Sequence, residues 1–146
     1  MVSTIEDTTQ NYAGLLIRPD GFIEDVLIPK DDLARFKLYS HVFAGDMIDV
    51  LPTNKLTETE VIIGDHSLMN GSPANLAANL WLVSTHRYYG LVCGPVLVVG
   101  LDPITEELKD VPPQVWNELP MLRRATLPVL RYLNPNHKAF FHELTT

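Results

Sequence analysis

Two neighbouring stretches decide the fold: residues 61–81 read VIIGDHSLMNGSPANLAANLW, and residues 89–102 read YGLVCGPVLVVGLD. Val61–Ile63 is a short apolar run of the kind that forms a buried strand. Leu91–Val99 is longer and rich in β-branched residues, and Gly94-Pro95 within it predicts a bulge near its start. We therefore expect two core strands here.

A helix is predicted between these strands. Asp65–Gly71 is rich in turn-forming residues, and Ser72 with Pro73 has the pattern of a helix start, with serine as the N-cap and proline at the first helical position. Ala74–Val83 then contains good helix formers. Cys93 lies in the apolar run that follows, so we expect a buried, unreactive thiol.

The upstream part of the chain predicts a hairpin and a helix. Residues 13–18 and 22–28 are apolar or alternating runs around Pro19-Asp20-Gly21, which is a hairpin turn signal. Asp31 and Asp32 suit the start of a helix, because acidic side chains interact favourably with the helix dipole there. That helix is expected to bury Leu33, Phe36 and Tyr39. A further strand over Met47–Leu51 is ended by Pro52.

The downstream part predicts helices. Pro112-Pro113 opens a helix that carries Val115 and Trp116, and Met121–Leu133 and Asn136–Leu144 are helical by pattern. The order of elements indicates an α+β fold: a small mixed β-sheet of about five strands covered by helices, with a helical C-terminal tail. We divide the chain into a flexible tail (1–12), an α+β domain (13–118) and a helical C-terminal extension of the same domain (119–146).

Composition indicates a single globular domain in a reducing compartment. The chain has 146 residues, of which 46% are hydrophobic and 20% charged, and it contains one cysteine. No apolar run reaches the roughly 18 residues that span a membrane, and residues 1–12 lack the features of a signal peptide. These observations predict a cytoplasmic protein with no membrane partner.

Charge is distributed unevenly. Residues 1–120 hold 7 Lys or Arg against 17 Asp or Glu, a net charge of −10, whereas residues 121–146 hold 4 against 1, a net charge of +3. An acidic body repels phosphates, so we expect no direct binding to nucleic acid. The alternatives left open are a solvated acidic surface and an acidic DNA mimic.

Four motifs resemble a small family found in bacteriophages and their hosts, the domain of unknown function 3846. The resemblance covers roughly residues 13–118 and is carried by Gly45–Val50, Gly64-Asp65-His66, Gly71–Asn75 and Leu91–Gly100. It implies an accessory protein of phage origin, acting in the host cytoplasm, and it implies no particular reaction.

Catalytic and metal chemistry find little support in the residue pattern. Asp65, His66 and Ser67 are adjacent in sequence, whereas catalytic triads are assembled from separate segments. No pair of histidines has the i,i+4 spacing of a helical zinc site, and Cys93 has no cysteine partner. We predict no enzyme activity, no metal and no cofactor.

Two groups of residues are candidates for binding. Asn75 and Asn79 lie four apart, just after the predicted helix start, where free N–H groups attract anions. With neighbouring polar residues they form a candidate nucleotide-like ligand site, His66, Asn70, Asn75, Asn79 and Arg87; the alternative is that the asparagines cap strand ends or bond loop main chain within the fold. The tail offers a candidate interaction surface of Arg123, Arg124, Arg131, Tyr132, Phe140 and Phe141; the alternative is that the aromatic residues pack on the domain's own core and the arginines remain in solvent.

The sequence therefore predicts a non-enzymatic phage accessory protein that binds a host protein, for host takeover or counter-defence. Homodimerisation is expected as a further possibility, because the basic tail complements the acidic body of another copy. The alternatives are a small-ligand binding or sequestering module and an acidic DNA mimic.

Overall fold

The computed structural model describes residues 11–51, 58–67, 70–86, 88 and 90–119. Its elements in chain order are β1 (Asn11–Ile17), β2 (Ile23–Pro29), α2 (Asp32–Val42), β3 (Ile48–Val50), β4 (Thr59–Gly64), α3 (Leu76–His86), β5 (Val96–Leu101) and β6 (Leu108–Lys109). Residues 113–119 are also helical. The α+β class predicted from the sequence is confirmed. The helices predicted over residues 121–144 lie outside the described residues.

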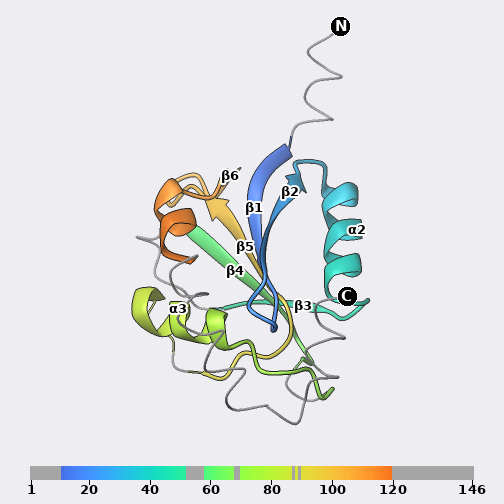
Figure 1. The fold of residues 1–146 in the computed structure, drawn as a ribbon. Helices are drawn as coiled ribbons and strands as arrows, with labels where there is room; N and C mark the ends of the chain where they lie inside the picture. The colour runs from blue at the N-terminus through green and yellow to red at the C-terminus, as the bar shows by residue number, and fades with distance from the viewer. Residues whose placement is uncertain (1–10, 52–57, 68–69, 87, 89, 120–146) are drawn as a thin grey trace, which may run out of the picture.

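The strands form one six-stranded sheet in the order β2-β1-β5-β4-β3, with β6 paired to β5 (Figure 1). Each of these pairings is antiparallel. β5 lies at the centre: Leu97 pairs with Leu16 of β1 on one side and with Ile62 of β4 on the other. The sequence did not predict β6, because a two-residue strand has no periodicity.

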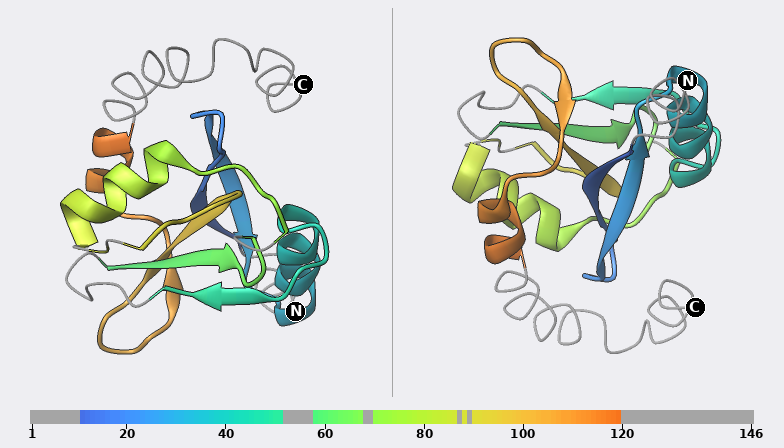
Figure 2. Two further views of the ribbon diagram at one scale, coloured as in Figure 1. Left: turned by 90° about the horizontal axis from the view of Figure 1, so that it is seen from below. Right: turned by 90° about the horizontal axis from the view of Figure 1, so that it is seen from above.

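Alternation along the strands gives the sheet two apolar faces. Leu15, Val61 and Val98 belong to the larger cluster, which also includes residues of α3 and of the helix at 113–119. Ile62 and Leu97 belong to the smaller cluster, which packs against residues of α2. Helices therefore lie on both sides of the sheet (Figure 2). Leu119, the last residue of the helix at 113–119, is fully buried in the larger cluster.

The predicted β-hairpin is confirmed. Gly21 has a φ of 86°, and the turn is closed by hydrogen bonds from the Arg18 amide to the Phe22 carbonyl and from the Gly21 amide to the Arg18 carbonyl. β1 begins at Asn11, so its first residues fall within the stretch predicted as a tail.

The predicted helix after Asp31 is confirmed, and of the three residues expected on its buried face only Tyr39 packs against the sheet. The Asp31 carboxylate accepts a hydrogen bond from the Ala34 amide and so caps α2. Leu33 and Phe36 are 63% and 67% exposed, whereas Tyr39 and Val42 pack toward the smaller cluster. Leu33 and Val42 are nine positions apart, which places their side chains on opposite sides of the helix. Because both sides of α2 carry apolar residues, spacing alone could not show which side packs against the sheet.

The predicted start of α3 needs a correction. The helix begins at Leu76 rather than at Pro73, and its cap is Asn75, whose Oδ1 accepts from the Ala78 amide at 3.1 Å. Ser72 instead donates its hydroxyl to Asn70. Ala74 cannot join the helix because it forms an antiparallel bridge with Cys93. Cys93 is buried, which raises the pKa of its thiol, as expected for an unreactive cysteine.

Candidate functional site

Asn75, a predicted ligand residue, is fully buried. Its Nδ2 donates to the carbonyls of Ile17 and Gly94 at 2.8 and 2.9 Å, in addition to the capping bond made by its Oδ1. The side chain therefore joins the end of β1, the approach to β5 and the start of α3. Both the Nδ2 group and the Oδ1 atom of Asn75 therefore form hydrogen bonds within the fold.

Asn79 has a similar role one turn later. Its Nδ2 donates to the carbonyls of Asn75 and Val92, and its Oδ1 accepts from the Val92 amide at 3.0 Å. The amide thus pairs with both main-chain groups of Val92, much as a neighbouring strand would. The prediction that Asn75 and Asn79 hold a ligand beside a helix start at residue 73 is replaced by a structural role for both.

The remaining residues of that predicted site are not drawn into one pocket. Asn70 is exposed, and its Oδ1 accepts from the amide and the hydroxyl of Ser72. His66 is turned toward Asp46 of the α2–β3 connection. Arg87 lies outside the described residues.

His66 and Asp46 form a two-point contact between loops. The Asp46 carboxylate accepts from the His66 amide at 2.9 Å and lies 2.8 Å from the ring Nδ1. These hydrogen bonds raise the pKa of His66 and lower the pKa of Asp46. Ser67 is buried and its amide bonds to Gly64, so the adjacent Asp65, His66 and Ser67 do not form a triad.

This contact predicts a pH-dependent stability. The contribution of His66 to folding stability is fully present below its ordinary pKa of 6.5 and is lost as the pH rises through its raised pKa. The contribution of Asp46 to folding stability is fully present above its ordinary pKa of 3.8 and is lost as the pH falls through its lowered pKa. His66→Gln should therefore destabilise the protein more at about pH 5.5 than at about pH 9. Urea unfolding at both pH values measures the difference.

The matched control places His66→Gln in an Asp46→Asn background, where the difference between the two pH values should become smaller, since Asp65 then remains to raise the pKa of His66. An equal loss of stability at acidic and alkaline pH in the parent protein would contradict the proposed pairing.

The predicted interaction residues Arg123, Arg124, Arg131, Tyr132, Phe140 and Phe141 lie outside the described residues. Within the described ranges no group of three or more His, Cys, Asp or Glu side chains is arranged to hold a metal ion. No helix in the same ranges is long and apolar enough to cross a membrane.

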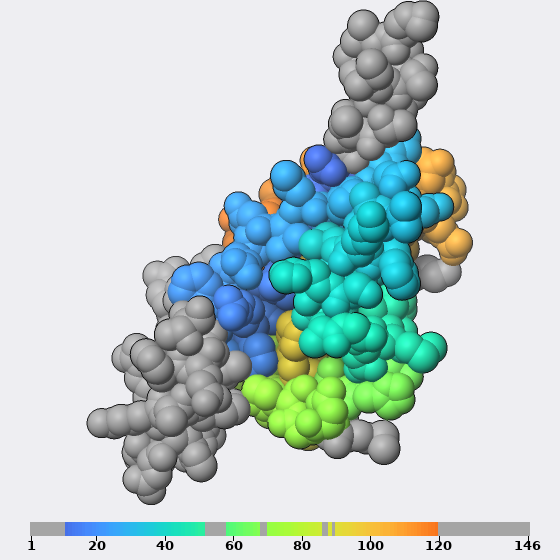
Figure 3. Space-filling view, turned by 90° about the vertical axis from the view of Figure 1, so that its right-hand side faces the viewer, coloured from blue at the N-terminus to red at the C-terminus, as the bar shows by residue number. Residues whose placement is uncertain are grey.

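A groove lies elsewhere, on the α2 side of the sheet. This groove has a volume of about 580 Å³ and lies between α2 and the strands β3, β4, β5 and β6. Its lining residues are Arg35, Tyr39, Ile48, Val50, Leu51, Glu58, Thr59, Glu60, Ile62, Leu101, Pro103, Glu106 and Leu108. α2 lies at the surface beside the β1–β2 hairpin (Figure 3).

The floor and one wall of the groove are apolar. Ile62 of β4 and Leu101 of β5 lie on the same face of the sheet by strand alternation, and Ile48 and Val50 continue that face onto the edge strand β3. Ile48 and Val50 are 39% and 44% exposed. On the outer edge of β3 the Val50 amide donates to the side chain of Asp49 at 2.9 Å.

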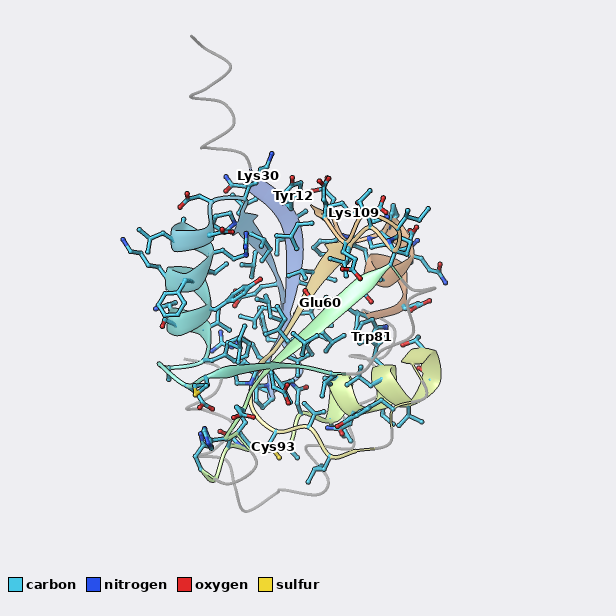
Figure 4. All side chains as sticks on the ribbon, turned by 180° about the vertical axis from the view of Figure 1, so that it is seen from behind. Tyr12, Lys30, Glu60, Trp81, Cys93 and Lys109 are labelled. Atoms are coloured by element: carbon cyan, nitrogen blue, oxygen red, sulfur yellow. The ribbon has the colours of Figure 1, made fainter. Side chains whose placement is uncertain are left out.

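Charged side chains line the rest of the groove. Three glutamates (Glu58, Glu60 and Glu106) face one arginine, Arg35, which is held by the carbonyl of Lys30 and the carboxylate of Asp32. Glu58 pairs with Lys109 at 2.9 Å. Figure 4 labels Glu60 between α2 and the β5–β6 connection.

Burial and neighbouring charges change the acidity of two lining groups. Burial raises the pKa of Tyr39 to about 12, while Arg35 opposes this rise and Glu60 adds to it. Burial also raises the pKa of Glu60, with opposition from Arg35 and a further increase from Glu106. Tyr39 therefore keeps its phenolic proton at neutral pH and offers a hydrogen-bond donor beside carboxylates.

Sequence reasoning missed the groove because its lining comes from distant segments. Two local signals were present: Arg35 and Tyr39 are four apart on a helix, and Glu60 shares a strand face with Ile62. Glu60 stands two positions before the buried Ile62, so it indicates where the buried face of β4 ends.

Comparison of the chain with protein-family models, with curated proteins and with solved structures found no match.

Proposed function

We propose that this protein is a non-enzymatic protein-binding module and that the groove between α2 and the β3–β4–β5 sheet receives a segment of its partner. The observation that carries the proposal is the combination of an apolar floor with an acidic rim in one groove of about 580 Å³. An accessory protein of phage origin that binds a host protein in the host cytoplasm fits this proposal.

The exposed aliphatic side chains favour a protein segment over a small polar ligand. Ile48 and Val50 present apolar surface next to the groove, and burying such surface drives protein association. The ligand-capture alternative rested on Asn75 and Asn79, whose side chains are bonded to main chain. The DNA-mimic alternative rests on the acidic balance alone.

The charges indicate which segment would fit. Glu58 is paired with Lys109, which leaves Glu60 and Glu106 against Arg35. This excess of negative charge favours a partner that carries Lys or Arg next to its apolar residues. The Asp49 side chain occupies the Val50 amide on the outer edge of β3, so the partner is expected to dock through its side chains. An amphipathic helix with a basic flank is the simplest segment of this kind.

Peptide binding tests the proposal. Two synthetic amphipathic helices with the same apolar face, one with lysine flanks and one with glutamate flanks, are titrated into the full chain and followed by fluorescence anisotropy. We expect the lysine peptide to bind and the glutamate peptide to bind at least about tenfold more weakly, a difference of roughly 1.4 kcal/mol.

Val50→Asn should weaken binding of the lysine peptide, because it places a polar amide on the apolar wall of the groove without changing its charge. The matched control is Leu27→Asn, at an exposed leucine of β2 outside the groove lining. Equal binding of both peptides, or indifference to Val50→Asn, would overturn the proposed docking surface.

A further inference from the structure

We infer that, in the absence of another partner, the groove is filled by the basic C-terminal segment, residues 121–144, of a second copy of the chain. This inference rests on the proposed function, since it names an occupant for the same groove.

Charge complementarity is the first reason. Residues 121–146 carry Arg123, Arg124, Arg131 and Lys138 against Glu143 alone, whereas residues 1–120 carry a net charge of −10. On the groove, Glu60 and Glu106 outnumber Arg35, and Glu58 is paired with Lys109. The segment is therefore opposite in sign to the surface that it would contact, which favours association and fixes its orientation.

The composition of the segment is the second reason. Between its basic residues it contains Leu127, Val129, Leu130, Tyr132 and Leu133, and Phe140 and Phe141 follow Lys138. Apolar and aromatic side chains next to arginines are the residue types that a groove with an aliphatic floor and a carboxylate rim can bury and pair.

The point at which the described chain ends favours a second copy over the same one. The helix at residues 113–119 packs with Val115 and Leu119 on the α3 side of the sheet. The groove lies on the opposite, α2 side, over Ile62 and Leu108. To bind the groove of its own molecule, a segment that follows residue 119 would have to pass around the edge of the sheet. To bind the groove of a second copy, it would not. If each copy gives its segment to the other, the result is a closed symmetric dimer.

Reciprocal charge reversal tests this inference on the full chain. One variant reverses the groove (Glu60→Lys with Glu106→Lys), and the other reverses the segment (Arg124→Glu with Arg131→Glu). Sedimentation equilibrium of the parent protein should show a dimer, and each variant alone should have a dimer dissociation constant raised by at least about tenfold.

An equal mixture of the two variants should recover a dimer of parental affinity. In that mixture the normal segment of one chain meets the normal groove of the other, and the two reversed surfaces also complement each other. A control variant, Asp25→Lys with Glu107→Lys, reverses two exposed carboxylates outside the groove lining and should leave the dimer intact.

Circular dichroism establishes that each variant is folded, and Glu106→Lys alone, at an exposed residue, replaces the double groove variant if Glu60→Lys prevents folding. A monomeric parent protein, or a dimer insensitive to the segment variant, would overturn the inference. So would a mixture that fails to associate although both variants are folded.

The two proposals fail in different ways. If the lysine peptide binds the groove but the parent protein is a monomer, the protein-binding function stands and the identity of the occupant is wrong. If both hold, the lysine peptide should dissociate the dimer, because it competes with the C-terminal segment for one surface.

Discussion

Replacing Asn75 with alanine is expected to lower the free energy of unfolding by about 4 kcal/mol. The substitution removes the cap of α3 and leaves the carbonyls of Ile17 and Gly94 without their side-chain donor in a fully buried position. A lost cap costs about 1 kcal/mol, and each buried group left without a partner costs about 1–3 kcal/mol. Urea unfolding at neutral pH measures the change.

Two further substitutions separate the contributions of Asn75. Asn75→Asp keeps an oxygen for the Ala78 amide but points a carboxylate at two carbonyl oxygens, so it should destabilise the protein at least as much as alanine. Asn117→Ala, at an exposed position of the helix at 113–119, should change stability by less than about 0.5 kcal/mol. A small effect of Asn75→Ala would mean that the asparagine does not hold these elements together.

Gly100→Ala is expected to destabilise the protein by about 3 kcal/mol. Gly100 lies in β5 opposite Lys109 of β6, and a methyl group there would overlap the carbonyl oxygens of Asp110 and Lys109. These are main-chain atoms, so relief requires β6 to move. Because Leu108 lines the groove, the same substitution should also weaken binding of the lysine peptide.

The matched control for Gly100→Ala is Gly14→Ala in β1. A methyl group at Gly14 would meet Cγ1 and Cδ1 of Ile28, at 2.7 and 2.9 Å, and side-chain atoms can shift at a lower cost than main-chain atoms. We therefore expect a loss of about 1 kcal/mol there. Thermal unfolding of both variants under identical conditions compares them, and equal melting temperatures would contradict the close packing of β5 against the chain after β6.

Local chemistry allowed a good part of the fold to be predicted. The turn at Pro19-Asp20-Gly21 and the cap at Asp31 each depend on residues adjacent in sequence, and both are confirmed. The start of α3 was wrong because a non-local contact overrides the local signal. The Ser72-Pro73 pattern is a valid helix start in isolation, but the bridge from Ala74 to Cys93 holds that segment against the sheet.

The candidate site was harder to predict than the fold. Asn75 and Asn79 were predicted to bind a ligand beside a helix start, but their hydrogen-bond partners, Ile17, Val92 and Gly94, come from other segments. A sequence shows that an amide is present and does not show whether main-chain groups already satisfy it. The groove is assembled from four segments, and its open floor depends on how far α2 extends across the sheet.

The edge of the sheet at β3 has a consequence for how the protein behaves at high concentration. An uncovered strand beside apolar side chains is a template on which further strands add, and the usual outcome is aggregation into fibrils. β3 is only three residues long, and Asp49 both places a charge on it and occupies the Val50 amide. The protein can therefore display Ile48 and Val50 for recognition while resisting edge-to-edge growth of its sheet.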